Sequence, residues 1–80
     1  MYIRTNSMQI VDRIVAALNR NGYRASFATA IHQHLPANLV AEESRGIVRV
    51  YDTTQDSHAA ALVCRISYNM VTDTITALAA

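Results

Sequence analysis

Residues 29–36, TAIHQHLP, decide between two ways of folding this chain. They place His32 and His34 one residue apart, shortly before Pro36, which is the only proline. On a strand, two side chains at this spacing point to the same face, whereas on a helix they point about 200° apart. The conformation of this stretch therefore determines whether it joins a sheet or forms a second helix.

The surrounding residues favour a strand over residues 23–33. Apolar side chains alternate along this range with smaller or polar ones, as in a half-buried strand. Phe27 and Ile31 also fit helical spacing, with Ser26 as an N-cap, and this helix is the alternative. Pro36 ends either element, because the residue before a proline avoids helical geometry.

The clearest element is an amphipathic helix from Met8 to Asn21. Its apolar residues recur at i, i+3, i+4 and i+7 and therefore form one stripe along the helix. The stripe consists of Ile10, Val11, Ile14, Val15 and Leu18. Ser7 or Asn6 can cap the start, and Gly22 stands where a residue in the left-handed region commonly ends a helix.

The second half of the sequence is typical of an antiparallel hairpin. Residues 37–44 fit a short helix or an edge strand, and a turn over 44–46 leads into a strand over 47–52 that is rich in β-branched residues. A polar loop over 53–58 separates this strand from a second one over 59–68. We expect the second strand to place the alternate residues Ala60, Leu62, Cys64, Ile66 and Tyr68 on one face.

The C-terminal residues and the overall pattern predict an α+β domain. β-Branched residues after position 70 favour a further strand, although Val71, Ile75 and Leu78 also suit a terminal helix. We interpret residues 1–80 as one domain in which the N-terminal helix packs on a small antiparallel β-sheet, with residues 1–6 flexible.

A winged-helix arrangement is the alternative fold. It requires helices over 8–21, 26–35 and 38–45, followed by a wing made of the hairpin. Its recognition helix would carry Glu42 and Glu43 toward the phosphates of DNA, which makes this alternative the less favoured one.

Composition indicates an intracellular protein. The chain has 80 residues and one cysteine, Cys64, so it cannot form an internal disulfide. Its longest apolar run, residues 59–64, is too short to cross a membrane. We therefore expect a cytoplasmic location and no membrane partner.

The titratable residues do not form a convincing catalytic or metal site. His32 and His34 would need further ligands such as His58 or Cys64, and their spacings match no compact zinc motif. Cys64 lies among apolar residues, which predicts a buried, inert thiol. The run Asp56-Ser57-His58 has the letters of a triad, but neighbouring residues cannot form its relay. We expect no enzyme activity, no metal and no cofactor.

The remaining candidates are surfaces for a partner. Arg13, Arg20 and Arg24 form one possible patch on the helix and its exit, and Arg49 and Tyr51 are further candidate partner or nucleic-acid contacts. A net charge of +1 argues against general nucleic-acid coating.

We interpret the chain as a non-enzymatic interaction module. Its small size and lack of motifs suggest an accessory or inhibitor protein of a phage or mobile element that binds a larger host protein complex. A free sheet edge or a second apolar surface would also favour a homodimer. A winged-helix DNA-binding regulator is the alternative, with nucleic acid as the less favoured partner.

Overall fold

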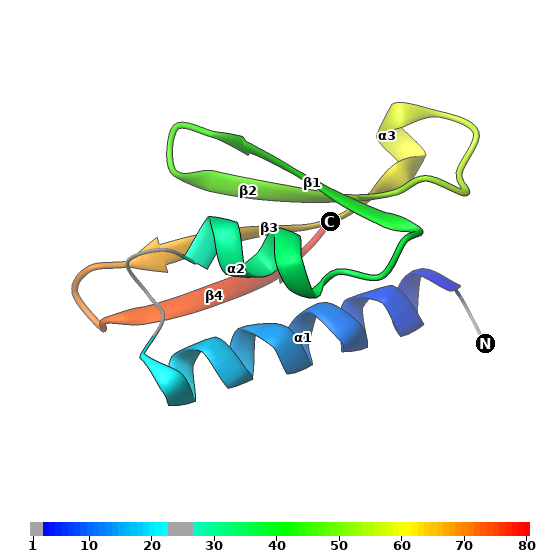
Figure 1. Cartoon of the computed structure of the whole chain (residues 1–80). Coiled ribbons are helices and arrows are strands. Elements are labelled where there is room, and N and C mark those ends of the chain that lie inside the picture. Colours follow the sequence, from blue (N-terminus) through cyan, green and yellow to red (C-terminus); the bar gives the residue numbers. More distant parts are fainter. Residues whose placement is uncertain (1–2, 23–26) are drawn as a thin grey trace.

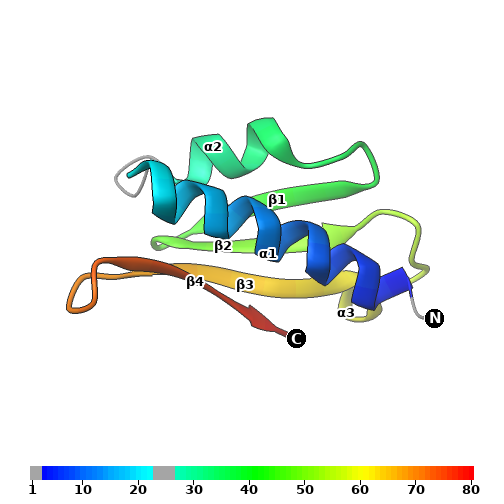
Figure 2. The ribbon, with the colours of Figure 1, turned by 90° about the horizontal axis from the view of Figure 1, so that it is seen from below.

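Two helices cover one face of a four-stranded antiparallel sheet, which confirms the α+β prediction (Figures 1 and 2). The computed structural model describes residues 3–22 and 27–80. The strands follow one another across the sheet in the order β1-β2-β3-β4. The elements are α1 (Ile3–Asn21), α2 (Phe27–His34), β1 (Leu39–Ser44), β2 (Ile47–Asp52), α3 (His58–Ala61), β3 (Leu62–Asn69) and β4 (Thr74–Ala79).

Helix α1 is longer than predicted at its N-terminal end. It begins at Ile3 instead of Met8, so residues 3–6 belong to the helix. Ser7 does not cap the helix; it is buried and extends the apolar stripe toward the N-terminus, one turn before Val11. Gly22 has a φ of 75°, as expected for the left-handed residue that follows a helix.

The favoured strand over 23–33 is wrong where the structure describes it, because residues 27–34 form helix α2. Phe27 and Ile31 are four residues apart and are both buried, so helical geometry places them on one inward stripe. A strand would also have turned Thr29, which is exposed, to the same face. Residues 23–26, including the proposed Ser26 cap, lie outside the described residues.

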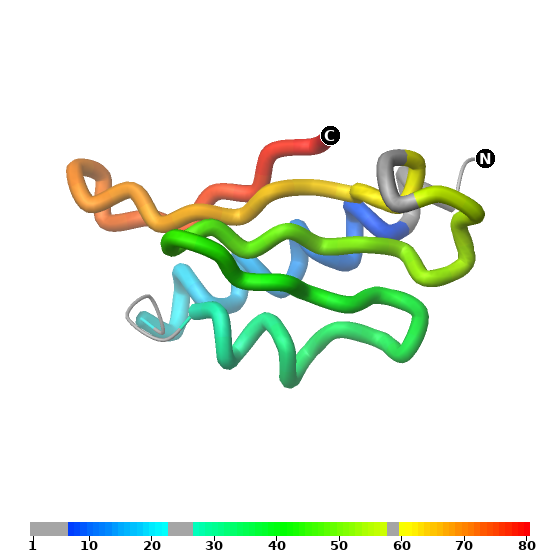
Figure 3. Tube along the Cα trace, turned by 90° about the horizontal axis from the view of Figure 1, so that it is seen from above, coloured from blue at the N-terminus to red at the C-terminus, as the bar shows by residue number. Residues whose placement is uncertain are grey.

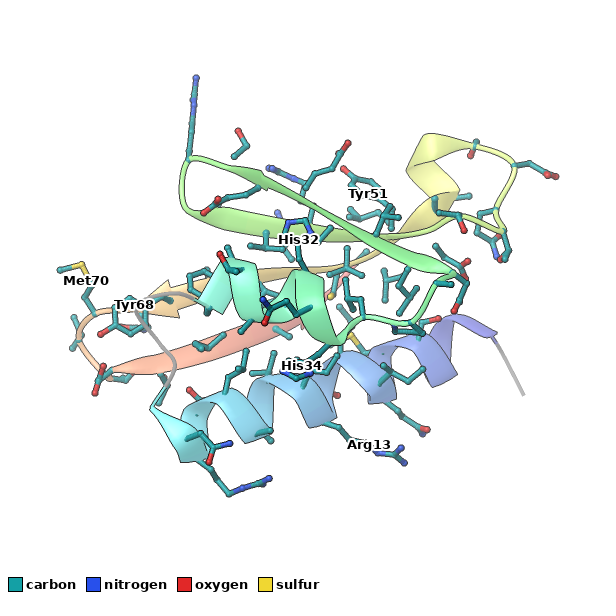
Figure 4. All side chains as sticks on the ribbon, in the orientation of Figure 1. Arg13, His32, His34, Tyr51, Tyr68 and Met70 are labelled. Carbon is teal, nitrogen blue, oxygen red and sulfur yellow. The ribbon has the colours of Figure 1, made fainter. Side chains whose placement is uncertain are left out.

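The two histidines of the opening stretch diverge. His32 and His34 are both exposed on α2 and point to different sides of the helix (Figure 4). The expectation that they share a strand face is therefore wrong. Their spacing on a helix separates the imidazoles too far in angle for one metal ion.

The segment that precedes β2 is a strand and not a helix, and this excludes the winged-helix alternative. Residues 39–44 form β1 and pair with β2 from Leu39 opposite Asp52 to Ser44 opposite Ile47. Arg45 and Gly46 join the strands with φ values of 56° and 79°, the positive values that a type I′ hairpin turn requires. No third helix exists over residues 38–45 to enter a DNA groove.

The predicted β2–β3 hairpin is confirmed, but the second strand begins later and in a different register. Residues 58–61 form the short helix α3, and the Ser57 hydroxyl accepts a hydrogen bond from the Ala60 N–H at 3.1 Å. A bulge shifts the pairing so that Tyr51 opposes Leu62 while Val50 opposes Cys64.

This bulge corrects the predicted face of β3. Leu62 lies on the face of Tyr51, away from the helices, and not on the face of Cys64. The extra residue, Val63, is buried next to Cys64. Strict alternation from Ala60 to Tyr68 fails because one inserted residue reverses the side-chain parity of the strand that precedes it.

The C-terminal segment forms β4, which pairs with β3 from Asn69 opposite Thr74 to Cys64 opposite Ala79. The Asn19 side chain joins this strand to α1. Its Nδ2 donates to the Ile75 carbonyl at 3.0 Å, and its Oδ1 accepts from the Ile75 N–H at 2.8 Å.

The core lies between the helices and the inner face of the sheet. Helix α1 packs mainly against β4 and β3, and α2 packs against α1 and β1. The buried apolar residues are Val11, Val15, Leu18, Phe27, Ile31, Leu39, Val48, Val50, Val63, Cys64, Ile66 and Ile75. Among the described helices, none is both long and apolar enough to cross a bilayer.

Candidate protein-interaction site

The structure does not bring the predicted site residues together. Arg13 and Arg20 are exposed on α1, whereas Arg49 and Tyr51 lie on the outer face of the sheet. Figure 4 shows Arg13 and Tyr51 on opposite sides of the molecule. Arg24 lies outside the described residues. The four described residues therefore do not form one surface.

Arg49 lies directly opposite Arg65 on the outer face. The two residues are partners in the β2–β3 register, and Glu42 opposes Arg49 from the other side. Neither guanidinium forms a hydrogen bond or ion pair with a described residue. Like charges opposite each other on a sheet repel, so this pair is a basic feature that carries a small energetic cost.

Tyr51 is covered on the outer face. The loop over 53–57 and α3 lie beside it, and together they border a groove of about 290 Å³. The residue is only 9% exposed, so it does not present the broad aromatic surface that was expected of an interface anchor.

Asp52 holds the loop that follows β2. Its Oδ1 accepts hydrogen bonds from the Thr54 hydroxyl at 2.6 Å and from the Thr54 N–H at 2.9 Å. These bonds hold the pKa of the carboxyl below its ordinary value, with smaller contributions in the same direction from Gln55 and Asn38, although burial acts in the opposite direction. Oδ2 is buried without a full hydrogen bond from any described residue. Asp52 therefore stabilises the loop as a carboxylate.

Cys64 is inaccessible at the centre of the core. Burial, with a smaller contribution from Asp12, raises the pKa of its thiol to about 12. A thiol in this state is neither a nucleophile nor a metal ligand at neutral pH. The side chain of His58 lies outside the described residues, and among those described no three His, Cys, Asp or Glu residues are placed to share a metal ion.

A groove of about 330 Å³ runs between α1 and the end of α2, where Arg13 and His34 form part of its rim. Its floor includes Leu18, which is already buried in the core. Arg13 and His34 are the only titratable side chains among its described lining residues, so the groove shows no defined catalytic or metal site.

The most exposed large apolar side chains lie at the tip of the β3–β4 hairpin. Residues 70–73 connect the two strands, and within this tip Met70 is 81% exposed and Val71 is 94% exposed. Figure 1 shows the tip at the end of the sheet opposite α3, and Figure 4 shows Met70 pointing away from the body of the molecule. Two adjacent apolar side chains are thus presented to solvent.

Hydrogen bonds hold this tip in one shape. The Asn69 side-chain oxygen accepts from the Val71 N–H at 2.9 Å and from the Thr72 N–H at 3.2 Å. The Tyr68 hydroxyl donates to the Asp73 carboxylate at 2.5 Å, and Asp73 has a φ of 54°. The polar groups of the loop are therefore engaged with one another, while the side chains of Met70 and Val71 are largely exposed to solvent.

Hydrogen bonds at both ends of residues 70–73 constrain the geometry of the tip. Ordering a loop on binding costs conformational entropy, and a loop that is already fixed avoids much of this cost. Sequence reasoning missed this site because residues 69–80 were considered only as a strand or helix. The available signal was an apolar pair, Met70-Val71, between turn-forming residues Asn69 and Asp73.

Comparisons of the chain with protein-family models, curated proteins and solved structures give no match.

Proposed function

We propose that this chain is a non-enzymatic interaction module that binds a partner protein by inserting Met70 and Val71 into an apolar pocket. The exposure of these two side chains on a hydrogen-bonded hairpin tip is the observation that carries the proposal. Transferring a methionine or valine side chain from water to an apolar pocket is worth about 1.5–3 kcal/mol. Because the loop is already held by hydrogen bonds, burying these two residues costs less ordering entropy, which suits an anchor for a small interface.

The residues around the tip favour a protein over a membrane or a nucleic acid. Asp73 places a carboxylate within the same loop, which disfavours anionic lipid and phosphate. Residues 70–73 contain no arginine and no aromatic ring, the side chains that commonly hold a loop at a membrane interface or stack on a base. The adjacent Tyr68 ring is tied to the loop through its hydroxyl bond to Asp73. A pocket in a protein can accept the apolar pair and hydrogen-bond the polar rim.

The expected niche, a phage or mobile-element accessory protein that inhibits a host complex, stays a prediction. Insertion of a tip into a partner's pocket is compatible with inhibition, because such a pocket is then blocked for other ligands. The geometry of the tip supports binding to a protein. It does not indicate the organism or complex to which that protein belongs.

The test is an affinity capture with matched variants. Three proteins are immobilised: wild type, the double variant Met70→Ser/Val71→Ser and the control Val40→Ser. Each is exposed to lysate of the host cell, with and without nuclease treatment. Val40 is 44% exposed on the outer sheet face and therefore controls for the loss of an exposed apolar side chain elsewhere. We expect one protein to bind wild type and Val40→Ser and to bind the tip variant at least tenfold more weakly, about 1.4 kcal/mol.

Equal capture by all three proteins would contradict the proposal. So would capture that disappears on nuclease treatment, or binding of the wild type to phospholipid vesicles that the tip variant loses. Circular dichroism and urea denaturation of the tip variant should match wild type, because neither replaced side chain packs in the core.

A further inference from the structure

The free edge of β4 is a second surface that the fold leaves open. In an antiparallel ladder such as β3–β4, only every second residue pair exchanges backbone hydrogen bonds. Because the Ala80 N–H donates to the Val63 carbonyl at 3.0 Å, the bonded pairs are those at even spacing from Val63–Ala80. Leu78 therefore pairs with Arg65 inside the sheet. Ala77 and Ala79 direct their N–H and C=O groups away from β3.

Part of this edge is covered within the chain. Ile75 has the same orientation as Ala77, and the Asn19 amide bonds both of its backbone groups. Among the described residues, none hydrogen-bonds the outward groups of Ala77 or Ala79. Figures 2 and 3 show the end of β4 at one margin of the sheet, with no described helix or strand beyond it.

The uncovered segment lacks the usual protection of edge strands. Residues 74–79, TITALA, contain no charge, no proline and no bulge, the features with which proteins commonly block further pairing. Leu78 is 56% exposed on the outer face beside this edge. The segment is therefore able to accept another strand.

We infer that β4 pairs with β4 of a second copy of this chain, antiparallel, about a two-fold axis at Leu78. In this register Ala77 of each copy opposes Ala79 of the other, so the four outward groups of each chain are all bonded. Leu78 then meets its symmetry mate as a non-hydrogen-bonded pair, where side chains approach most closely. The register leaves the Asn19–Ile75 bonds intact.

The occupant is a second copy because the segment is self-complementary. Two identical three-residue edges satisfy each other completely, and one apolar side chain covers its equivalent across the axis. The contact is short compared with a standard interface of about 800 Å² per partner, so we expect a weak dimer with a dissociation constant on the order of 100 µM.

Pairing would produce one eight-stranded sheet with two hairpin tips. The first residues of the two β4 strands would lie about 27 Å apart, with one tip at each end of the paired region. A partner with repeated pockets would then be bound bivalently. This consequence rests on the proposed function, whereas the dimer itself does not.

The dimer is tested by sedimentation velocity and amide hydrogen exchange over a range of protein concentrations. We expect the sedimentation coefficient to rise toward that of a dimer, and the amides of Ala77 and Ala79 to become protected as concentration increases. The amide of Leu78 is the internal reference, because its partner lies in the same chain. Leu78→Lys should remain monomeric, and Val71→Lys, a matched change at the tip, should dimerise like wild type.

Ala77→Pro provides a second variant. The N–H of Ala77 is not used in the β3–β4 ladder, so its removal by proline should leave the fold intact. This variant too should be monomeric. A monomeric wild type at about 1 mM would overturn the inference. A dimer that survives Leu78→Lys and Ala77→Pro would do the same. Neither result affects the capture experiment on Met70 and Val71.

Discussion

The ionisation of Asp52 contributes to the stability of the fold. Its carboxylate accepts two hydrogen bonds from Thr54, which lower its pKa in the folded protein below the ordinary value of 3.8. A lowered pKa stabilises the folded state at higher pH, and this contribution is lost as the pH falls through 3.8 and then through the folded pKa. We predict that Asp52→Asn is less stable than wild type at about pH 7, by roughly 1–2 kcal/mol.

The difference between Asp52→Asn and wild type should shrink as the pH is lowered from about 7 to 3, because wild type alone loses this carboxylate. Urea denaturation at each pH measures the free energy of unfolding. Asp56→Asn, an exposed change in the same loop, is the control. A destabilisation by Asp52→Asn that is independent of pH would show that ionisation of Asp52 has no role.

Cys64 should be chemically silent in the folded protein. Its thiol is fully buried, and burial raises its pKa to about 12, so almost no thiolate exists at neutral pH. We predict that iodoacetamide labels it only when the chain unfolds, at a rate that rises with urea in step with the unfolded fraction. Mass spectrometry of timed samples measures the labelling. Labelling of the native protein at the rate of a free cysteine would contradict this prediction.

At the scale of elements, the β2–β3 pair contains an unfavourable contact. Arg49 and Arg65 face each other across the two strands without a bonded counter-ion among the described residues. Replacing Arg65 by threonine, a residue that suits strands, removes the repulsion. We predict that Arg65→Thr raises the free energy of unfolding by about 0.5 kcal/mol at low salt.

Salt provides the control for the Arg65→Thr variant. At about 1 M salt the screening length falls to about 3 Å, so the advantage of the variant should largely disappear. Urea denaturation at the two ionic strengths measures both values. A variant that is less stable than wild type at low salt would show that packing of the Arg65 stem outweighs the repulsion.

At the scale of the whole molecule, Asn19 joins two ends of the sequence. Its two hydrogen bonds to Ile75 span 56 positions and connect the helical layer to the last strand. We predict that Asn19→Ala lowers the free energy of unfolding by about 1–3 kcal/mol, since two partly buried backbone groups lose their partners. Hydrogen exchange should show faster exchange of the Ile75 amide.

Asn21→Ala is the matched change for Asn19→Ala, because Asn21 is exposed at the end of the same helix. It should alter stability by no more than about 0.5 kcal/mol. If both variants behave alike, helix propensity and not the contact with β4 explains the effect of Asn19.

The sequence by itself determined the elements whose pattern has one explanation. Periodicity over 8–21 fits only a helix, and β-branched residues over 47–52 fit only a strand, because each pattern creates one apolar face in one conformation. The left-handed conformations of Gly22 and Gly46 follow from the freedom of glycine to adopt positive φ. The class of fold followed from these elements together.

Only the tertiary structure decided the rest. Residues 27–34 fit either period, and burial of Phe27 with Ile31 against the rest of the core selected the helix over the strand. The bulge at Val63 is not visible as a sequence pattern, because it depends on the register of β3 against β2. The exposure of the hairpin tip and of the β4 edge could not be predicted for a related reason. Whether a side chain or backbone group is covered depends on which elements pack around it. In TAIHQHLP, Pro36 limited how far an element could extend, and the helix ends at His34. Long-range packing decided that this element is a helix.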